Sequence, residues 1–317
     1  MRLVTIDHGG LGLPAVVSGE EVLIFRLAAP LVDIAGWVPA TMIGLLEGGS
    51  EGLETVRRIL DRVEEGRDGL RARLRAIEAL MPLGEVRLLA PVPEPRLFMS
   101  TGLAYRDHVG EMRGPQLTTP AGSMRCASSI IGPEAPIVLP SQFPDMVDIE
   151  VELSVVIGRP TYHVSVDEAM DSVAGYTLYN DVSARDWNAA RDFDLIRQGK
   201  QFPTFSPCGP WILTADELPD PYDVDVRSTI NGEVLQSDNT GNLLFTIAEV
   251  IAHFSQWFRF LPGDIVTTGS PGGVGWAKDP QIFLKPGDVV TVEAEGVGIL
   301  RNRVVAEADI ESERSTR

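Results

Sequence analysis

Residues 148–157 constrain the fold of this chain more than any other segment, because they join an acidic alternation to a buried-strand pattern. Acidic and apolar residues alternate from Asp148 to Glu152, and the rest of the segment is apolar apart from one serine. We expect a single strand at the centre of a sheet, since a near-continuous apolar run suits a strand covered on both faces. Side chains two positions apart share a face, so Glu150 and Glu152, with Asp148, should point the same way.

Converging carboxylates predict a metal site. Two ionised carboxylates in a half-buried sheet repel each other unless a cation lies between them. Asp181 is a third candidate, because it follows a predicted strand at residues 175–180 and begins a polar turn. Three oxygen ligands without a nearby cysteine or histidine favour Mg²⁺, Mn²⁺ or Ca²⁺ over zinc. The alternative is a solvated edge strand whose acidic face binds nothing, and the apolar half of the segment argues against it.

A proline-rich connector at residues 90–95 divides the predicted elements into two groups. Before it, strand patterns at residues 3–6, 15–17 and 21–27 and a helical pattern at 53–80, broken at Gly66 and Gly69, predict a small α+β N-terminal domain of residues 1–89. Residues 90–317 then form a mostly β domain with short helices at 167–173 and 246–258. Its predicted strands are residues 137–139, 147–157, 175–180, 211–214, 224–230, 265–268, 289–294 and 299–305.

The charge balance argues against nucleic acid as a partner. The chain has 45 acidic and 27 basic residues, a net charge of -18, and therefore little capacity to neutralise phosphates. An anionic substrate would need local cations. The candidates are Arg106, Arg125, Arg185 and Lys200.

The sequence predicts a cytoplasmic protein that does not cross a membrane. No apolar run approaches the length of a membrane span, and the N-terminus does not read as a signal peptide. Cys126 and Cys208 lack the spacing of a metal or redox motif and are too few to staple a chain of this length, which suits a reducing compartment.

His108 and Glu111 are candidates for acid–base chemistry. If their segment forms a helical turn, a carboxylate three residues on can reach the imidazole and orient it as a general base that activates water. A helical turn facing solvent would explain the same spacing. Residues 263–275 are glycine-rich but lack the lysine and hydroxyl pattern of a phosphate loop, so they predict only a tight turn that exposes a hydroxyl.

In their order along the chain, these segments resemble the fumarylacetoacetate hydrolase family, from about Leu97 to Val305. Any one segment alone is weak evidence for the family, whereas the whole set in this order is specific to it. The resembling segments are residues 102–111, 128–133, 148–158, 175–186, 199–211, 231–233, 261–275 and 284–288. The resemblance implies a mixed β-sandwich roll, a homodimer, and one divalent ion per subunit, Mg²⁺ or Mn²⁺, with Ca²⁺ as a substitute in a crystal. Residues before 90 resemble the variable N-terminal domain of bacterial members.

The resemblance also assigns roles to single positions. Glu150, Glu152 and Asp181 match the metal carboxylates, His108 and Glu111 the water-activating pair, and Lys200 the lysine that assists at the reacting oxygens. Positions near substrate or metal are Tyr105, Arg125, Arg185, Thr204 and Ser270. Three positions depart from the family pattern, namely Ala104 for asparagine, Ser123 for phenylalanine and Arg125 for lysine. Arginine offers a planar fork suited to a carboxylate.

The reaction implied by the resemblance is hydrolysis of a carbon–carbon bond in a 2,4-dioxo acid, an acylpyruvate or fumarylpyruvate, through an enolate that the metal stabilises. Such a reaction belongs to aromatic or sugar-acid catabolism. The same site chemistry without the attacking water would give a decarboxylase, isomerase or hydratase of 2-oxo acids. The presence of His108 and Glu111 favours the hydrolase, and a keto-acid-binding protein without activity is a more remote alternative.

Overall fold

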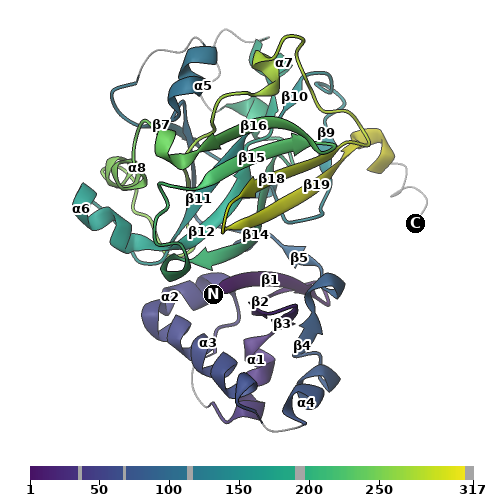
Figure 1. The fold of residues 1–317 in the computed structure, drawn as a ribbon, viewed down its shortest axis with the longest axis vertical. Coiled ribbons are helices and arrows are strands. Elements are labelled where there is room, and N and C mark those ends of the chain that lie inside the picture. Colours follow the sequence, from purple (N-terminus) through teal and green to yellow (C-terminus); the bar gives the residue numbers. More distant parts are fainter. Residues whose placement is uncertain (35–37, 67–68, 113–116, 190–196, 311–317) are drawn as a thin grey trace.

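The computed structural model describes residues 1–34, 38–66, 69–112, 117–189 and 197–310 of the chain. Strands dominate, and the helices lie mainly around them (Figure 1). The predicted fold class, a mixed β-sandwich roll with an added α+β part, is confirmed. In Figure 1 the elements before residue 90 form the lower part of the molecule and the later elements form the upper part.

One large sheet runs through both parts of the molecule. Its strand order is β4-β3-β2-β1-β14-β12-β11-β17-β6-β7, and two short strands, β5 and β8, pair with β1 and β14. The strands of this sheet are β1 (Arg2–His8), β2 (Leu11–Ser18), β3 (Glu21–Leu23), β4 (Leu80–Pro82), β5 (Leu88–Leu89), β6 (Phe98–Gly102), β7 (Ala121–Met124), β8 (Ile130–Ile131), β11 (Val151–Ile157), β12 (Val173–Asn180), β14 (Ser206–Thr214) and β17 (Ile265–Thr267). The division at residue 89 stays a prediction, and β1 nevertheless pairs directly with β14.

A second sheet packs against the large one and makes the sandwich. Its order is β16-β15-β18-β19-β9, and a separate two-stranded ladder joins β10 to β13. The strands concerned are β9 (Ile137–Leu139), β10 (Val147–Asp148), β13 (Ser183–Ala184), β15 (Asp225–Ile230), β16 (Glu233–Asn239), β18 (Val289–Ala294) and β19 (Gly298–Ala306). Val155 of β11 shares a core with Val226 and Val292 of the second sheet, whereas Val156 packs in the core that contains the N-terminal helices. Every residue of β11 is buried, as expected of a central strand.

The helices cover the edges and faces of these sheets. They are α1 (Phe25–Ala28), α2 (Met42–Glu47), α3 (Gly49–Glu64), α4 (Leu70–Ala76), α5 (Arg106–Glu111), α6 (Val166–Ala169), α7 (Arg185–Ala189) and α8 (Ile247–Phe254). Short 3₁₀ turns lie at η1 (Ala29–Val32), η2 (Leu83–Glu85), η3 (Ala127–Ser129), η4 (Met170–Ser172), η5 (Gln198–Lys200), η6 (Ala215–Glu217), η7 (Thr240–Asn242) and η8 (Gly275–Ala277). Helix α8 begins with a capping box between Thr246 and Glu249, which satisfies two of its free amides.

Two predicted strands do not continue as single strands. The strand at residues 21–27 ends at Leu23, and Phe25 begins α1, whose phenylalanine and Ala28 are buried. The strand at residues 147–157 is two strands, because the chain leaves the ladder at Ile149 and Glu150. The predicted helical pattern at 53–80 gives α3 and α4, but it extends too far, because α4 ends at Ala76 and Leu80 begins β4. Residues 67–68 between the two helices lie outside the described residues. Local patterning could not show the break within residues 147–157, because residues distant in sequence, Arg185 and Gly275, anchor Asp148.

Gly175 lies in β12, opposite Thr214 of β14. A methyl group there would lie 2.2 Å from the Leu213 carbonyl oxygen and 2.7 Å from Ile212 Cγ2. We expect Gly175→Ala to lower the free energy of unfolding by about 2 kcal/mol, the usual cost of overpacking. Urea unfolding measures the effect, with Gly84→Ala as control because nothing lies within 4 Å of its added carbon. Equal stability of the two variants would contradict the prediction.

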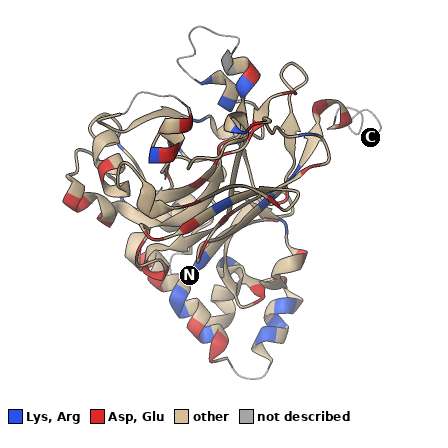
Figure 2. Ribbon diagram, turned by 45° about the horizontal axis from the view of Figure 1, so that its top comes forward, with Lys and Arg blue, Asp and Glu red and all other residues tan. Residues whose placement is uncertain are grey.

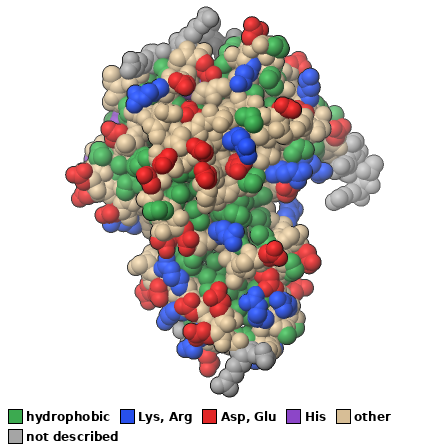
Figure 3. Space-filling model, in the orientation of Figure 1, with side chains coloured by type: hydrophobic (Ala, Val, Ile, Leu, Met, Phe, Trp, Pro, Cys, Tyr) green, Lys and Arg blue, Asp and Glu red, His purple; other side chains and the backbone are tan. Residues whose placement is uncertain are grey.

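Acidic and basic side chains are mixed over the surface. Figure 2 shows both signs along the helices of the lower part, and the face in Figure 3 has red, blue and green side chains interspersed. Among the described residues, none of the helices combines the length and the apolar character that a bilayer crossing requires.

Candidate active site

A cavity of about 320 Å³ collects most of the predicted functional residues. It lies at the ends of β6 and β7, the start of β11, the residue after β12, and η5. Its lining residues are Ser100, Thr101, Gly102, Leu103, His108, Met112, Ala121, Gly122, Ser123, Arg125, Glu150, Glu152, Asp181, Arg185, Arg197, Lys200 and Ser270. A larger cavity, beside Leu139 and Lys285, contains none of the predicted residues.

Strand pairing brings the three predicted metal carboxylates together. β11 and β12 are antiparallel neighbours with Val151 opposite Asn180. Glu150 and Glu152 therefore flank the start of one strand, and Asp181 follows the end of the other. The amide of Asp181 donates to the Glu150 carbonyl at 2.9 Å. Carboxylate oxygens of the three residues lie within 4.8 Å of one another, and all three residues are buried.

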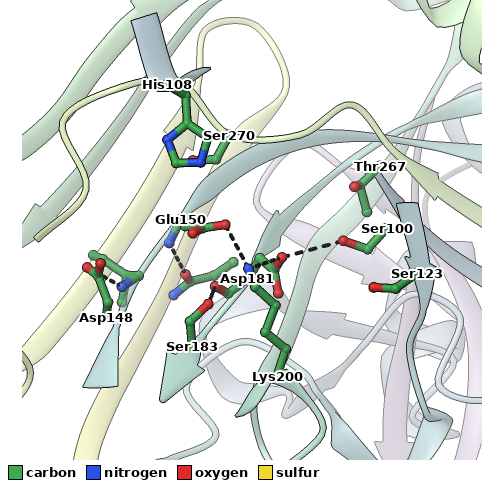
Figure 4. A network of polar contacts seen from close by, with 12 residues as sticks. Ser100, His108, Ser123, Asp148, Glu150, Asp181, Ser183, Lys200, Thr267 and Ser270 are labelled. Atoms are coloured by element: carbon green, nitrogen blue, oxygen red, sulfur yellow. Dashed lines mark hydrogen bonds and ion pairs between the residues drawn. The ribbon is translucent and has the colours of Figure 1, made fainter. Parts of the chain in front are cut away.

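Lys200 lies between two of these carboxylates (Figure 4). Its Nζ is 2.9 Å from Glu150 Oε2 and 2.6 Å from Asp181 Oδ2. Burial alone would raise the pKa of Glu150, but the charges of Lys200 and Arg185 outweigh it and hold that pKa well below its usual range. Burial also opposes ionisation of Asp181, and Arg125 and Lys200 together lower its pKa. Both carboxylates are therefore held in the charged form.

Glu152 differs from the other two carboxylates. Its Oε2 is buried and has no hydrogen-bond partner among the described residues. Burial, and then the charge of Asp181, raise the pKa of Glu152 well above its usual value. A buried polar atom normally has a partner, and an oxygen-only set of three carboxylates suits a hard divalent cation as that partner. The side chains present therefore fit the predicted cation, Mg²⁺ or Mn²⁺.

His108 and Glu111 form the predicted pair. Both lie on α5, three residues apart, and His108 Nδ1 is 2.8 Å from Glu111 Oε1. The other oxygen of Glu111 accepts from the Gly273 amide at 2.7 Å, so the glycine-rich loop fixes the carboxylate. Gly273 has a φ of 94°, in the left-handed region that favours glycine. His108 and Ser270 both line the cavity, and among the described residues His108 Nε2 has no hydrogen-bond partner.

The two arginines predicted near substrate line the cavity, but protein carboxylates take up their donors. Arg125 donates to Asp181 Oδ2 at 2.9 Å and to the hydroxyls of Ser100, Ser123 and Tyr179. Its pKa is raised chiefly by Asp181, against the effect of burial. The substitution of serine at position 123 thus supplies an oxygen for the arginine at position 125.

Arg185 is engaged in the same way. It donates to Asp148 Oδ2 at 3.0 and 2.9 Å and to Glu150 Oε1 at 2.6 Å, and it is buried. Asp148 accepts in turn from the amides of Gly275 and Trp276. Arg185 therefore links Glu150, a predicted metal ligand, through Asp148 to the loop after β17, rather than offering a free fork to the cavity.

Replacing Arg125 tests its role as a holder of Asp181. We expect Arg125→Met to lower the free energy of unfolding by about 3 kcal/mol, because it leaves a buried carboxylate with one cation fewer. Arg125→Lys restores the charge without the planar fork, so it should recover part of this loss. Thermal and urea unfolding of the two variants measure the difference. Wild-type stability in the methionine variant would contradict the role.

Two of the predicted substrate positions do not line the cavity. Tyr105 is fully buried beside Ala104 and Leu243, and burial raises the pKa of its hydroxyl. Thr204 Oγ1 accepts from the Val138 amide at 2.8 Å, which orients it toward β9. Ser270 does line the cavity, and its hydroxyl accepts from Gln236 Nε2 at 2.8 Å.

Several supporting residues were not predicted. Gln236 of β16 bonds to both the Val151 amide and Ser270, and Asn180 accepts from the Glu150 amide at 3.2 Å. Tyr179 donates to Asp181 Oδ1 at 2.9 Å. No local motif distinguishes a glutamine or asparagine that will meet the site from one on the surface. The position of Tyr179, two residues before a predicted ligand in a strand, was the one available signal.

Residues 98–305 match the family described as fumarylacetoacetate (FAA) hydrolase, C-terminal. The human protein named oxaloacetate tautomerase FAHD2A, mitochondrial, is 41% identical over 268 residues, which are 84% of this chain and 81% of the human protein. The 2,4-didehydro-3-deoxy-L-rhamnonate hydrolase of Sphingomonas sp. (strain SKA58) is 42% identical over 229 residues, 71% of this chain and 80% of that protein.

A solved structure resembles nearly the whole chain. It is the crystal structure of maleylpyruvate hydrolase from Sphingobium sp. SYK-6 in complex with manganese(II) ion and pyruvate. The TM-score is 0.72 at 30% sequence identity, and the match covers 96% of this chain and 99% of the other.

Proposed function

Because the chain belongs to the fumarylacetoacetate hydrolase family, we propose that it is a divalent-metal-dependent hydrolase that cleaves a carbon–carbon bond in a small 2,4-dioxo acid. The observation that carries this proposal is that three buried carboxylates and the His108–Glu111 pair meet at one cavity. The manganese and pyruvate named for the Sphingobium hydrolase support it.

Glu150, Glu152 and Asp181 are the proposed metal ligands. A divalent cation bound there would act as a Lewis acid and as a template for the carboxylate and 2-oxo oxygens of a substrate. We propose Mg²⁺ or Mn²⁺, since both accept carboxylate ligands while retaining positions for other oxygens. Lys200, which contacts Glu150 and Asp181, adds positive charge beside the reacting oxygens.

His108 is the proposed general base. Glu111 holds Nδ1, so Nε2 takes a proton from water and the hydroxide formed attacks the carbonyl at C4 of the substrate. Glu111 stabilises the imidazolium that results. The C3–C4 bond then breaks, which releases a carboxylic acid and the enolate of pyruvate. The enolate takes up at C3 the proton that His108 had accepted, which restores the neutral imidazole.

A second candidate is keto–enol tautomerisation of oxaloacetate. The printed name of the human relative, at 41% identity over 84% of this chain, favours it. His108 would in this case move a proton between C3 and the oxygen on C2, and no water would be consumed. Both reactions need the carboxylates and the base, and they differ in whether a bond between carbons is broken.

Measuring the products distinguishes the two candidates. The purified protein with Mg²⁺ or Mn²⁺ is given a panel of acylpyruvates and, separately, enol-oxaloacetate. Metal-dependent release of pyruvate with the matching carboxylic acid supports the hydrolase. Rapid loss of enol absorbance without pyruvate release supports the tautomerase and would overturn our first proposal. Failure to act on either substrate class would overturn both candidates.

The compartment and assembly are also proposals. Cys126 is exposed and free, and Cys208 is buried and free, which agrees with a reducing compartment such as the cytoplasm. The human relative is named as mitochondrial, so fractionation of the source cells is the direct test.

We propose a homodimer with a small 2-oxo acid as ligand and with no nucleic-acid or membrane partner. Light scattering of the purified protein checks the dimer.

A further inference from the structure

Arg197 differs from the other basic residues of the cavity. Arg125, Arg185 and Lys200 each form ion pairs with protein carboxylates. Arg197 lines the same cavity and is exposed, and within the described part of the chain no carboxylate lies in ion-pair distance of it. Its guanidinium is therefore available to a ligand, unlike those of the two arginines that resemblance placed near substrate.

The charges around the cavity leave Arg197 without a counter-charge. Among the described residues, three cations, Arg125, Arg185 and Lys200, are matched by the carboxylates with which they pair, Asp148, Glu150 and Asp181. Glu152 and Glu111 bring two further negative charges, which a bound divalent cation would offset. Arg197 then remains as the one cation of this count that a carboxylate of the ligand would neutralise.

The backbone connects Arg197 to the reacting end of the cavity. Arg197 directly precedes η5, and the Lys200 amide donates to its carbonyl at 2.9 Å. The turn therefore joins Arg197 to a residue whose ammonium contacts Glu150 and Asp181. Arg197 has a φ of 52°, a conformation that side chains with a Cβ adopt at a cost, and such positions cluster at ligand sites.

We propose that Arg197 binds the distal carboxylate of a 2-oxo diacid whose 2-oxo end lies at Glu150, Glu152 and Asp181. The inference rests on the proposed function for the position of the 2-oxo end. A guanidinium can bind a carboxylate with two parallel hydrogen bonds, which gives both affinity and orientation. Another part of the cavity lining is apolar, at Leu103, Met112 and Ala121. A substrate with a neutral acyl group would bind against that part instead of at Arg197.

A matched pair of ligands tests the proposal without turnover. 2-Oxoglutarate and 2-oxopentanoate have the same chain length and differ in the terminal carboxylate, and neither has the 4-oxo group that hydrolysis needs. Calorimetric titration of the Mg²⁺-loaded protein should show the diacid binding at least about tenfold more tightly. We expect Arg197→Gln to reduce this preference to less than about twofold, and Arg197→Lys to retain part of it.

Arg303→Gln is the matched control, because it removes the same charge from an exposed arginine outside the cavity lining. It should keep the wild-type preference. A wild-type protein that fails to prefer the diacid, or an Arg197→Gln variant that prefers it as strongly as wild type, overturns the proposal. Pyruvate release from acylpyruvates is scored separately. An Arg197-dependent preference in a protein that cleaves none of them would sink the proposed hydrolysis and leave the assignment of Arg197 standing.

Discussion

Replacing Glu152 with glutamine is expected to abolish metal-dependent activity while leaving the metal-free protein at least as stable as the wild type. The loss in kcat/KM should be on the order of a thousandfold or more, because a metal supplies several kcal/mol of transition-state stabilisation. Stability should not fall, because Glu152 contributes no ion pair in the described structure and one of its oxygens is buried without a hydrogen-bond partner.

Thermal unfolding with and without Mn²⁺ separates these two effects. A ligand at a hundred times its Kd stabilises a protein by about 2.7 kcal/mol, so wild type should show a clear rise in Tm with the metal. Glu152→Gln should show no rise. Glu150→Gln is the contrasting variant, since Glu150 bonds to Lys200 and Arg185 and its loss leaves both cations short of a partner. We expect it to unfold at a lower temperature than Glu152→Gln in the absence of metal.

A metal-dependent rise in Tm that persists in Glu152→Gln would remove this residue from the ligand set. A large loss of stability in the metal-free variant would show that the carboxylate has a structural partner. Either result would contradict the prediction that Glu152 has no partner in the metal-free protein and binds the metal.

The acidic triad of Glu150, Glu152 and Asp181 could be predicted from the sequence, because it depends on short-range features. Glu150 and Glu152 lie in one alternating segment, and Asp181 directly follows the next strand of the same sheet. Consecutive antiparallel strands bring the start of one beside the end of the other, so their polar ends meet. The pairing of His108 with Glu111 depended only on helical spacing, and the structure brings their atoms to 2.8 Å.

The roles of the basic residues were harder to predict, because the sequence does not show which group a charged side chain will pair with. Arg125 and Arg185 were expected to face substrate, and the structure places their donors on Asp181, Asp148 and Glu150. No sequence motif distinguished Arg197. Its distinguishing feature is tertiary, because it lines the cavity and no carboxylate of the described residues lies within ion-pair distance of it. Ion pairs between residues 37 and 56 positions apart are properties of the tertiary fold.

The break between β10 and β11 has a similar origin. Patterning predicted one strand, because alternation continues through Ile149. Asp148 instead accepts from its own neighbour's amide, from Gly275 and Trp276, and from Arg185, which anchors it to another part of the fold. The chain leaves the ladder after this anchor, and β11 begins beyond Glu150. A local pattern contains no information about an anchor supplied 127 residues away.

Replacing His108 with alanine is expected to lower kcat for acylpyruvate cleavage by about a hundredfold to ten-thousandfold, the usual contribution of a general base. Metal binding should survive, since His108 bonds to Glu111 rather than to the acidic triad. Steady-state pyruvate release gives kcat, and the Mn²⁺-dependent rise in Tm reports the metal. Glu111→Gln keeps a hydrogen-bonding group but removes the charge, so it should cause a smaller loss.

The pattern across these variants discriminates between the mechanisms. If His108→Ala cleaves acylpyruvates at the wild-type rate while Glu152→Gln is inactive, His108 does not activate the water, and its hydrolytic assignment is wrong. If both variants lose cleavage but His108→Ala still tautomerises oxaloacetate, the base serves hydrolysis alone. Loss of both reactions in His108→Ala, with the metal-dependent Tm rise intact, would mean that one imidazole moves the proton in either reaction, so that substrate, rather than a different base, decides between water attack and proton return to C3.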